Sequence, residues 1–110
     1  MNTTERIAAV RATIAKLSEI ADPDKLIYRP DEFKGITNAE LKELVEMLEA
    51  EGVDRVMVSD GLFDCEFEFN CHIDGVFVTG KTTKTEVSAS GVSPRDRLFR
   101  VAEYDEQKRA

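Results

Sequence analysis

The spacing of a phosphate-binding loop, G-x-x-x-x-G-K-T, occurs at Gly75, Gly80, Lys81 and Thr82. In a working loop of this kind, backbone N–H groups and the lysine hold nucleotide phosphates, and the loop joins a strand to a helix. Here Asp74-Gly75 has the sequence of a type I′ hairpin turn, and the residues that follow are β-prone. The context favours a hairpin, so nucleotide binding at this segment is the least favoured function.

His72 is the second residue that could do chemistry, because a histidine titrates near neutral pH. Asn70 and Asp74 lie two residues to either side of it, so all three share one face of an extended strand. General acid–base catalysis needs a positioned partner in a site that excludes water, and an open strand face is not a pocket. We therefore predict that the chain is not an enzyme and has no catalytic residue.

The two cysteines, Cys65 and Cys71, belong to the same expected strand. Six residues of extended chain span ~20 Å, whereas a disulfide requires Cα atoms within ~7 Å, so the two cannot bridge each other in a flat strand. Both fall on its apolar face, where a cysteine acts as a small buried hydrophobe. Cys71 and His72 point to opposite faces and cannot share a metal ion. We expect no metal site and no cofactor.

Residues 63–74, FDCEFEFNCHID, alternate between apolar odd positions and polar even positions. Such alternation predicts a strand with one buried face and one solvent face. Asp64, Glu66 and Glu68 follow one another along the polar face at ~6.6 Å, and a flat row of carboxylates does not converge on a cation. These three are the first candidates for contact with a partner; the alternative is that they only solvate the strand.

The charge balance limits the kinds of partner. The chain has 110 residues with 22 acidic against 15 basic side chains, a net charge of −7. Nucleic acids and anionic membranes attract cationic proteins, so we expect neither as a direct partner. An acidic surface suits a protein partner with a basic surface, although net charge also serves solubility alone. With no apolar run near the ~20 residues of a membrane helix and no signal-peptide pattern, the expected location is cytoplasmic.

A second group of candidates lies in residues 22–35, DPDKLIYRPDEFKG, a long connection for a compact domain. Residues 26–28 have the composition of a short strand. Tyr28, Arg29 and Phe33 are residue types enriched at interface hot spots. The alternative is that Phe33 and the two aliphatic residues before Tyr28 cover an edge of the core, and this interpretation is favoured for those three. For Tyr28 and Arg29 both interpretations stay open.

Two helices are expected around this connection. The first is capped at Asn2, with Thr3 and Thr4 as rival caps. It carries one apolar stripe over about 16 residues and ends at Asp22-Pro23. The second begins with a capping box of Thr37 and Glu40 and stops at Gly52.

Glu46 and Glu49 lie toward the C-terminal end of the second helix, where carboxylates meet the negative end of the helix dipole. No lysine or arginine lies between Glu43 and Gly52 to offset them. A broken local rule marks a place to look for function, so both glutamates are candidate partner contacts. The alternative is that the cost is small and screened by salt.

Two Asp-Gly turns predict a three-stranded antiparallel meander. A turn at residues 60–61 would place Val58 opposite Phe63, and a turn at residues 74–75 would place Lys81 opposite Glu68. Both registers put the apolar side chains on the same face. The third strand either runs on to about Thr85 or bends into a fourth short strand at residues 86–89, and the pattern leaves this open.

A third helix is expected after Ser93-Pro94. Arg95, Arg97 and Arg100 crowd its first turns, and they either meet the acids that end the second helix or form a small basic site. The sequence thus predicts one α+β domain over residues 1–110, in α-α-β-β-β-α order, with helices packed on one face of an antiparallel sheet of three or four strands.

The absence of catalytic motifs and the acidic charge together predict a small non-catalytic protein-binding module. The expected type is an inhibitor, antitoxin, immunity or anti-defence protein that masks the basic, nucleic-acid-binding surface of a partner. The partner-binding residues expected from the sequence are Tyr28, Arg29, Phe33, Glu46, Glu49, Asp64, Glu66 and Glu68. The alternative is a homo-oligomeric assembly protein, for example a homodimer formed through the first helix or an edge strand.

Overall fold

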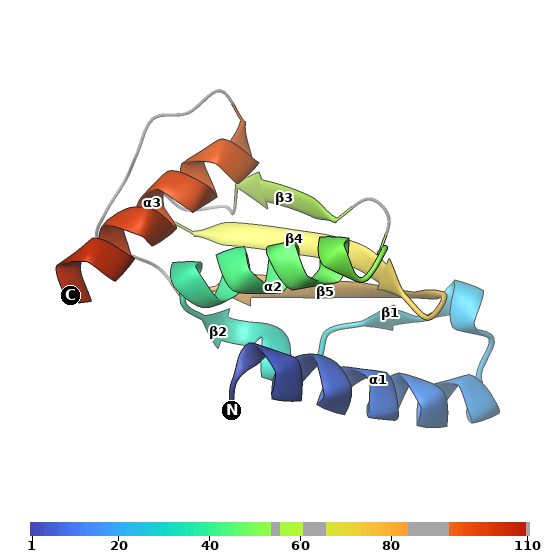
Figure 1. Ribbon diagram of the computed structural model, residues 1–110. Coiled ribbons are helices and arrows are strands. Elements are labelled where there is room, and N and C mark those ends of the chain that lie inside the picture. The colour runs from blue at the N-terminus through green and yellow to red at the C-terminus, as the bar shows by residue number, and fades with distance from the viewer. Residues whose placement is uncertain (54–55, 61–65, 84–92, 110) are drawn as a thin grey trace.

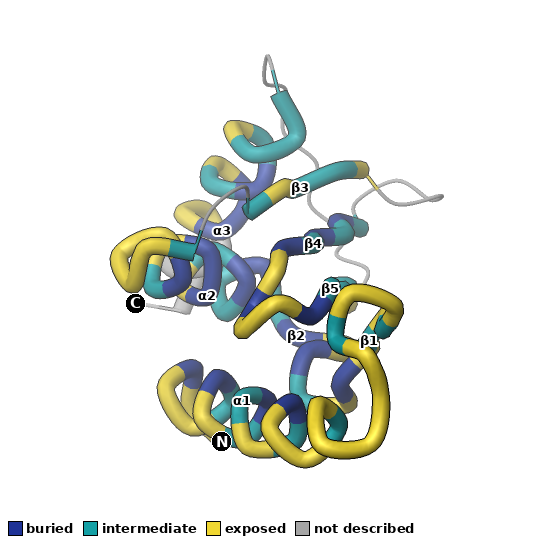
Figure 2. Tube along the Cα trace, turned by 90° about the vertical axis from the view of Figure 1, so that its right-hand side faces the viewer, coloured by how far each residue is buried: buried dark blue, intermediate teal, exposed yellow. Residues whose placement is uncertain are grey.

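A computed structural model describes residues 1–53, 56–60, 66–83 and 93–109, and at residues 105–109 it describes the backbone alone. The chain forms three helices on one face of a five-stranded mixed sheet (Figures 1 and 2). The helices are α1 (Thr3–Ile20), α2 (Asn38–Ala50) and α3 (Pro94–Arg109). The strands are β1 (Ile27–Tyr28), β2 (Lys34–Ile36), β3 (Met57–Asp60), β4 (Phe67–Ile73) and β5 (Val76–Thr82). The predicted α+β class, with helices on one face of the sheet, is confirmed.

The first two helices begin where their caps predict. Asn2 and Glu5 form a reciprocal capping box at α1, and Thr37 and Glu40 form another at α2. Each box satisfies backbone N–H groups that have no partner inside the helix. Helix α2 ends at Ala50, and Gly52 then takes a φ of 84°, a left-handed conformation that glycine adopts without steric cost. Both helices bury one apolar stripe: Ile7, Val10 and Ile14 on α1, and Leu41, Leu44, Val45 and Leu48 on α2.

The β4–β5 hairpin has the predicted register. Glu68 lies opposite Lys81, and Ile73 lies opposite Val76 across the turn. The two turn residues, Asp74 and Gly75, have φ values of 50° and 86°, and positive φ at both central positions defines a type I′ turn.

The predicted register of β3 against β4 is wrong. Val58 lies opposite Phe69, six residues later along β4 than the predicted partner Phe63. Asp60 lies opposite Phe67, a pairing that is incompatible with the predicted register of a two-residue turn at 60–61. Asp60 instead accepts a hydrogen bond of 2.8 Å from Arg97 of α3, a tertiary contact that competes with the local turn preference. Because the shift is an even number of residues, the predicted faces are unchanged.

The segment between α1 and α2 adds two strands that lie parallel to β5. The sheet is therefore mixed and larger than the antiparallel meander that was predicted. β1 confirms the short strand at 26–28 and pairs Ile27 with Phe77. β2 was not predicted, and it pairs Lys34 with Lys81. The segment also contains two 3-10 turns, η1 (Pro23–Lys25) and η2 (Asp31–Phe33). The possible strand at residues 86–89 lies outside the described residues.

The core lies between the helix layer and the sheet, and its aromatic centre is a pair of rings. The rings of Phe33 and Phe69 lie 5.5 Å apart between centroids. Gly80, opposite Phe69 on β5, leaves room for this pair. A Cβ added at Gly80 would overlap the Phe69 ring and lie 2.8 Å from the carbonyl oxygen of Phe33. Among the described residues, no helix combines the length and apolarity needed to cross a membrane.

Candidate binding site on the outer face of the sheet

The sheet face that points away from the three helices is called the outer face here, and no described helix or strand covers it (Figure 2). The alternation in β4 explains its composition. Phe67, Phe69, Cys71 and Ile73 are buried beneath the helices. The residues between them, together with the odd-numbered residues of β5, therefore point to the outer face. The apolar and polar faces expected for this strand are confirmed over residues 66–73.

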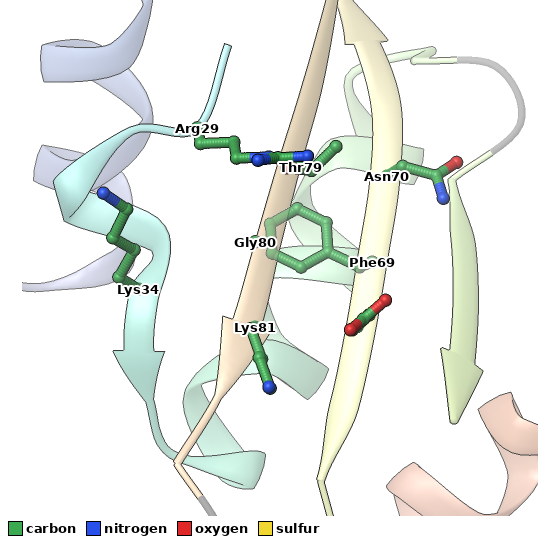
Figure 3. Close-up of a pocket in the computed structure, with 8 residues that line it drawn as sticks. Arg29, Lys34, Phe69, Asn70, Thr79, Gly80 and Lys81 are labelled. Atoms are coloured by element: carbon green, nitrogen blue, oxygen red, sulfur yellow. The ribbon is translucent and has the colours of Figure 1, made fainter. Parts of the chain in front are cut away.

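A hollow of about 430 Å³ opens on this outer face (Figure 3). Its volume lies within the range of small-ligand pockets. The residues that line this outer-face hollow come from β4, β5 and the segment at β1–β2: Arg29, Lys34, Glu68, Phe69, Asn70, Thr79, Gly80 and Lys81. Figure 3 shows the Arg29 side chain extending across β5 toward Thr79.

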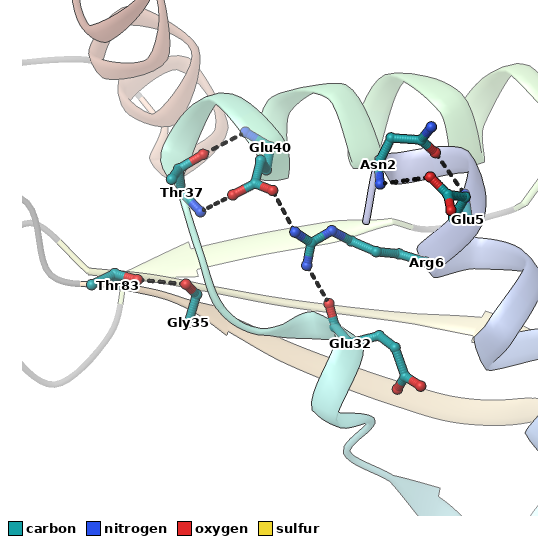
Figure 4. Close-up of polar contacts among 8 residues, drawn as sticks. All are labelled: Asn2, Glu5, Arg6, Glu32, Gly35, Thr37, Glu40 and Thr83. Carbon is teal, nitrogen blue, oxygen red and sulfur yellow. Dashed lines mark hydrogen bonds and ion pairs between the residues drawn. The ribbon is translucent and has the colours of Figure 1, made fainter.

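Polar contacts fix the segment that supplies Arg29 and Lys34 (Figure 4). The guanidinium of Arg6 on α1 donates to the carbonyl oxygen of Glu32 at 3.0 Å and to the carboxylate of Glu40 at 2.6 Å. At the other end, the Thr83 hydroxyl donates to the carbonyl oxygen of Gly35 at 2.6 Å. The edge of the hollow is thus anchored to α1, to α2 and to the end of β5.

Glu40 is the titratable group of this anchor. Partial burial raises the pKa of Glu40, but hydrogen bonds from the backbone and side chain of Thr37 and the positive charge of Arg6 outweigh burial. The pKa of Glu40 therefore lies below its ordinary value, and the carboxylate is charged at neutral pH.

Two cations of the hollow already face a carboxylate of the chain. Lys81 Nζ lies 3.1 Å from Glu66 Oε2, and Lys34 Nζ lies 3.0 Å from Asp31 Oδ1. The remaining charged groups are Arg29 and Glu68. Within the described residues neither makes a hydrogen bond or an ion pair through its side chain. The hollow therefore has one cation and one anion without a counter-charge in that part of the chain.

Only some of the residues predicted to bind a partner lie at the hollow. Arg29 and Glu68 both line the hollow. Glu66 is next to it, but only 14% of its side chain is exposed and it is paired with Lys81. Tyr28 packs against the core and is half-buried. Phe33 is fully buried, in agreement with the favoured interpretation of its role.

The acids of α2 lie in the helix layer, away from the outer face. Glu49 forms an ion pair with Arg95 of α3. This agrees with the first of the two alternatives for the α3 arginines, in which they meet the acids at the end of the second helix. Glu51 pairs with Arg11 of α1 at 2.9 Å. Glu46 is exposed on α2. The unfavourable charges at the end of this helix are thus partly offset by cations of the neighbouring helices.

Asp64, the remaining predicted partner contact, lies outside the described residues.

Of the eight residues that line the hollow, only Arg29 and Glu68 were predicted as site residues from the sequence. Among the other polar ones, Lys34 and Thr79 were not singled out at all, and Asn70 was considered only as a neighbour of His72. The predicted β4–β5 register contained enough information to place Asn70 beside Thr79. Lys34 could not be placed, because the parallel pairing of β2 with β5 joins residues far apart in the chain.

The other chemical candidates lie apart from the hollow or within the sheet itself. Gly75 lies in the hairpin turn and Gly80 lies within β5, so this segment does not form a phosphate loop. His72 packs against the ring of Phe77 with centroids 5.4 Å apart. Burial raises the pKa of the Cys71 thiol to about 11, so it stays protonated at neutral pH and is a poor nucleophile. The described residues contain no group of three side chains suited to hold a metal ion.

Compared with family models, curated proteins and solved structures, the chain matches none of them.

Proposed function

We propose that the chain is a non-catalytic protein-binding module whose partner site is the outer face of the sheet. One observation carries the proposal: Arg29, Glu68 and Thr79 line the hollow, and none has a side-chain hydrogen bond or ion pair within the described part of the chain. Glu68 and Thr79 are partly buried, and polar groups without partners at such a surface gain from hydrogen bonds supplied by a docked molecule. Arg29 is exposed and would gain a counter-charge. A protein docked on this face would supply them.

The overall charge supports a partner with a basic surface. A net charge of −7 would speed its encounter with a cationic protein. The proposed type remains an inhibitor, antitoxin, immunity or anti-defence protein. Arg29 and Lys34 place a further requirement on the partner. Both are cations at the edge of the hollow, so a uniformly basic partner surface would be repelled there. The partner surface is therefore basic as a whole, with an acidic group opposite Arg29.

Affinity capture from the native host tests the proposal. The tagged chain would be incubated with host extract, eluted with a salt gradient and examined by mass spectrometry. We expect one stoichiometric partner, eluted by moderate salt, that the Glu68→Lys variant fails to retain. Glu43→Lys makes the same charge change on the exposed side of α2 and should retain the partner.

Two outcomes would contradict the proposal. Equal recovery by wild type and Glu68→Lys would remove the outer face as the partner site. Recovery of the chain alone would favour the homo-oligomeric alternative.

A further inference from the structure

We propose that the outer-face hollow binds a zwitterionic group, with a ligand carboxylate at Arg29 and a ligand ammonium at Glu68. This inference rests on the proposed role of the outer face and deepens it by naming the chemistry that the hollow accepts. It does not require that the ligand be part of a protein.

The first step is the distribution of charge. Lys34 and Lys81 are paired with Asp31 and Glu66, so they add little net attraction for an anion. Arg29 is exposed and Glu68 is half-buried, and each lacks a counter-charge in the described residues. A ligand with a single charge would leave the other group unpaired, whereas a ligand with both charges would pair each of them.

The second step is distance. Arg29 directly follows β1, Glu68 lies on β4, and β5 runs between these two strands. Two strand spacings separate β1 from β4 by ~10 Å. Tyr28 pairs with Val78, so Arg29 is level with Thr79, whereas Glu68 pairs with Lys81, two residues further along β5. The backbones of Arg29 and Glu68 are therefore ~12 Å apart. The Arg29 side chain covers part of this distance by extending across β5 toward Thr79 (Figure 3). Glu68 lies on the next strand and two residues further along, so a ligand that pairs both groups must separate its own charges by several bonds.

The third step is the chemistry of the groups themselves. A guanidinium offers two parallel N–H donors that match a carboxylate. Figure 3 shows Arg29 extending toward Thr79, whose hydroxyl is a further donor. A carboxylate such as Glu68 accepts hydrogen bonds from an ammonium. It also repels a second negative charge, so the hollow should disfavour phosphate and dicarboxylates.

Two sources could supply such a ligand: a free small amino acid, or acidic and basic side chains of a polypeptide. The probe for the first is 6-aminohexanoate, with hexanoate and hexylamine as analogues that each lack one charge. The probe for the second is the capped tripeptide acetyl-Lys-Ala-Glu-amide, whose charges are all on side chains. Binding would be measured by chemical-shift titration of the ¹⁵N-labelled chain at constant ionic strength.

For the wild type we expect at least one zwitterionic probe to bind at least fivefold more tightly than hexanoate and hexylamine. The tighter of the two zwitterionic probes identifies the source. Arg29→Gln and Glu68→Gln should each weaken its binding at least tenfold, because each removes one pairing charge. Glu68→Gln should also tighten hexanoate binding, since it removes the repulsion of a lone anion.

Matched controls make the same changes of charge in the helix layer. Lys16→Gln on α1 and Glu43→Gln on α2 alter exposed residues and should leave binding within twofold of wild type. Equal binding of zwitterions and single-charge analogues, unchanged binding by the two hollow variants, or no shift with any probe would overturn the inference. Host-protein capture that depends on Glu68 would stand in each of these cases, so failure here is distinguishable from failure of the proposed function.

Discussion

Single residues determine the shape of both sides of the sheet. On the buried side, Gly80 lets the ring of Phe69 and the backbone of Phe33 approach β5. On the outer side, the same part of β5 carries Thr79 and Lys81, which line the hollow. A side chain added at Gly80 would therefore disturb the core directly and the outer face only through the strand.

Gly80→Ala should destabilise the fold. The added Cβ overlaps the Phe69 ring and approaches the Phe33 carbonyl, and overpacking of a dense core costs ~1–3 kcal/mol. Urea unfolding of the wild type and variant would measure the loss. Phe69→Leu provides the control, because Gly80→Ala should cost less in that background. Equal costs in both backgrounds would show that the ring does not determine the requirement for glycine.

Glu40 should make stability depend on pH at the acidic end. Its pKa is lowered in the folded chain, since hydrogen bonds from Thr37 and the charge of Arg6 outweigh the effect of burial. Because the pKa of Glu40 is lower in the folded chain than its ordinary value of 4.5, ionised Glu40 stabilises the fold. This contribution to the free energy of unfolding is complete above pH 4.5 and is lost as the pH falls through the folded-state pKa. We expect Glu40→Gln to cost about 1 kcal/mol at pH 7: hydrogen bonds to charged groups are worth about 1.5–3 kcal/mol, and solvent screening of the partly exposed Glu40 carboxylate lowers that figure.

The measurement is urea unfolding of wild type and Glu40→Gln from pH 7 to pH 3. The difference between the two should shrink as the wild-type carboxylate is protonated. A difference that stays constant over this range would mean that the charge of Glu40 does not contribute.

Secondary-structure elements were predictable where their signals were local. The capping boxes at Asn2 and Thr37 and the type I′ turn at Asp74 each depend on a few adjacent residues, and each formed as expected. The β3–β4 register failed because the contact of Asp60 with Arg97 joins distant segments.

The same limit applies to the candidate site. Glu68 was identified from strand alternation alone. Its relation to Arg29 and Lys34 depends on two short strands whose parallel pairing with β5 leaves no periodic pattern in the sequence.

The observed register can be tested by engineered disulfides. Met57 lies opposite Asn70, close enough for a bridge in an antiparallel pair. The predicted register would instead place Met57 opposite Asp64. With both native cysteines replaced, we expect Met57→Cys/Asn70→Cys to oxidise readily and Met57→Cys/Asp64→Cys to stay reduced, as measured by mass after thiol alkylation. The reverse result would restore the two-residue turn at 60–61.

At the scale of the whole molecule, the two-layer architecture presents two routes to association. One is the outer face, with its charged hollow. The other is the edge of the sheet at β3, which is the last strand in the described order and carries Met57 with 56% exposure. An unpaired edge strand can pair with a second copy, so the homo-oligomeric alternative makes a definite prediction about this edge.

We expect the chain to be monomeric at low salt. Each copy has a net charge of −7, and like charges oppose self-association most strongly where screening is weak. Sedimentation velocity at 20 and 500 mM salt over a range of protein concentrations would measure this. A stable dimer at low salt would contradict the expectation and support a homo-oligomer. In that case Met57→Lys on β3 should dissociate a dimer formed through the sheet edge, whereas Ala12→Glu on the exposed side of α1 should dissociate one formed through that helix.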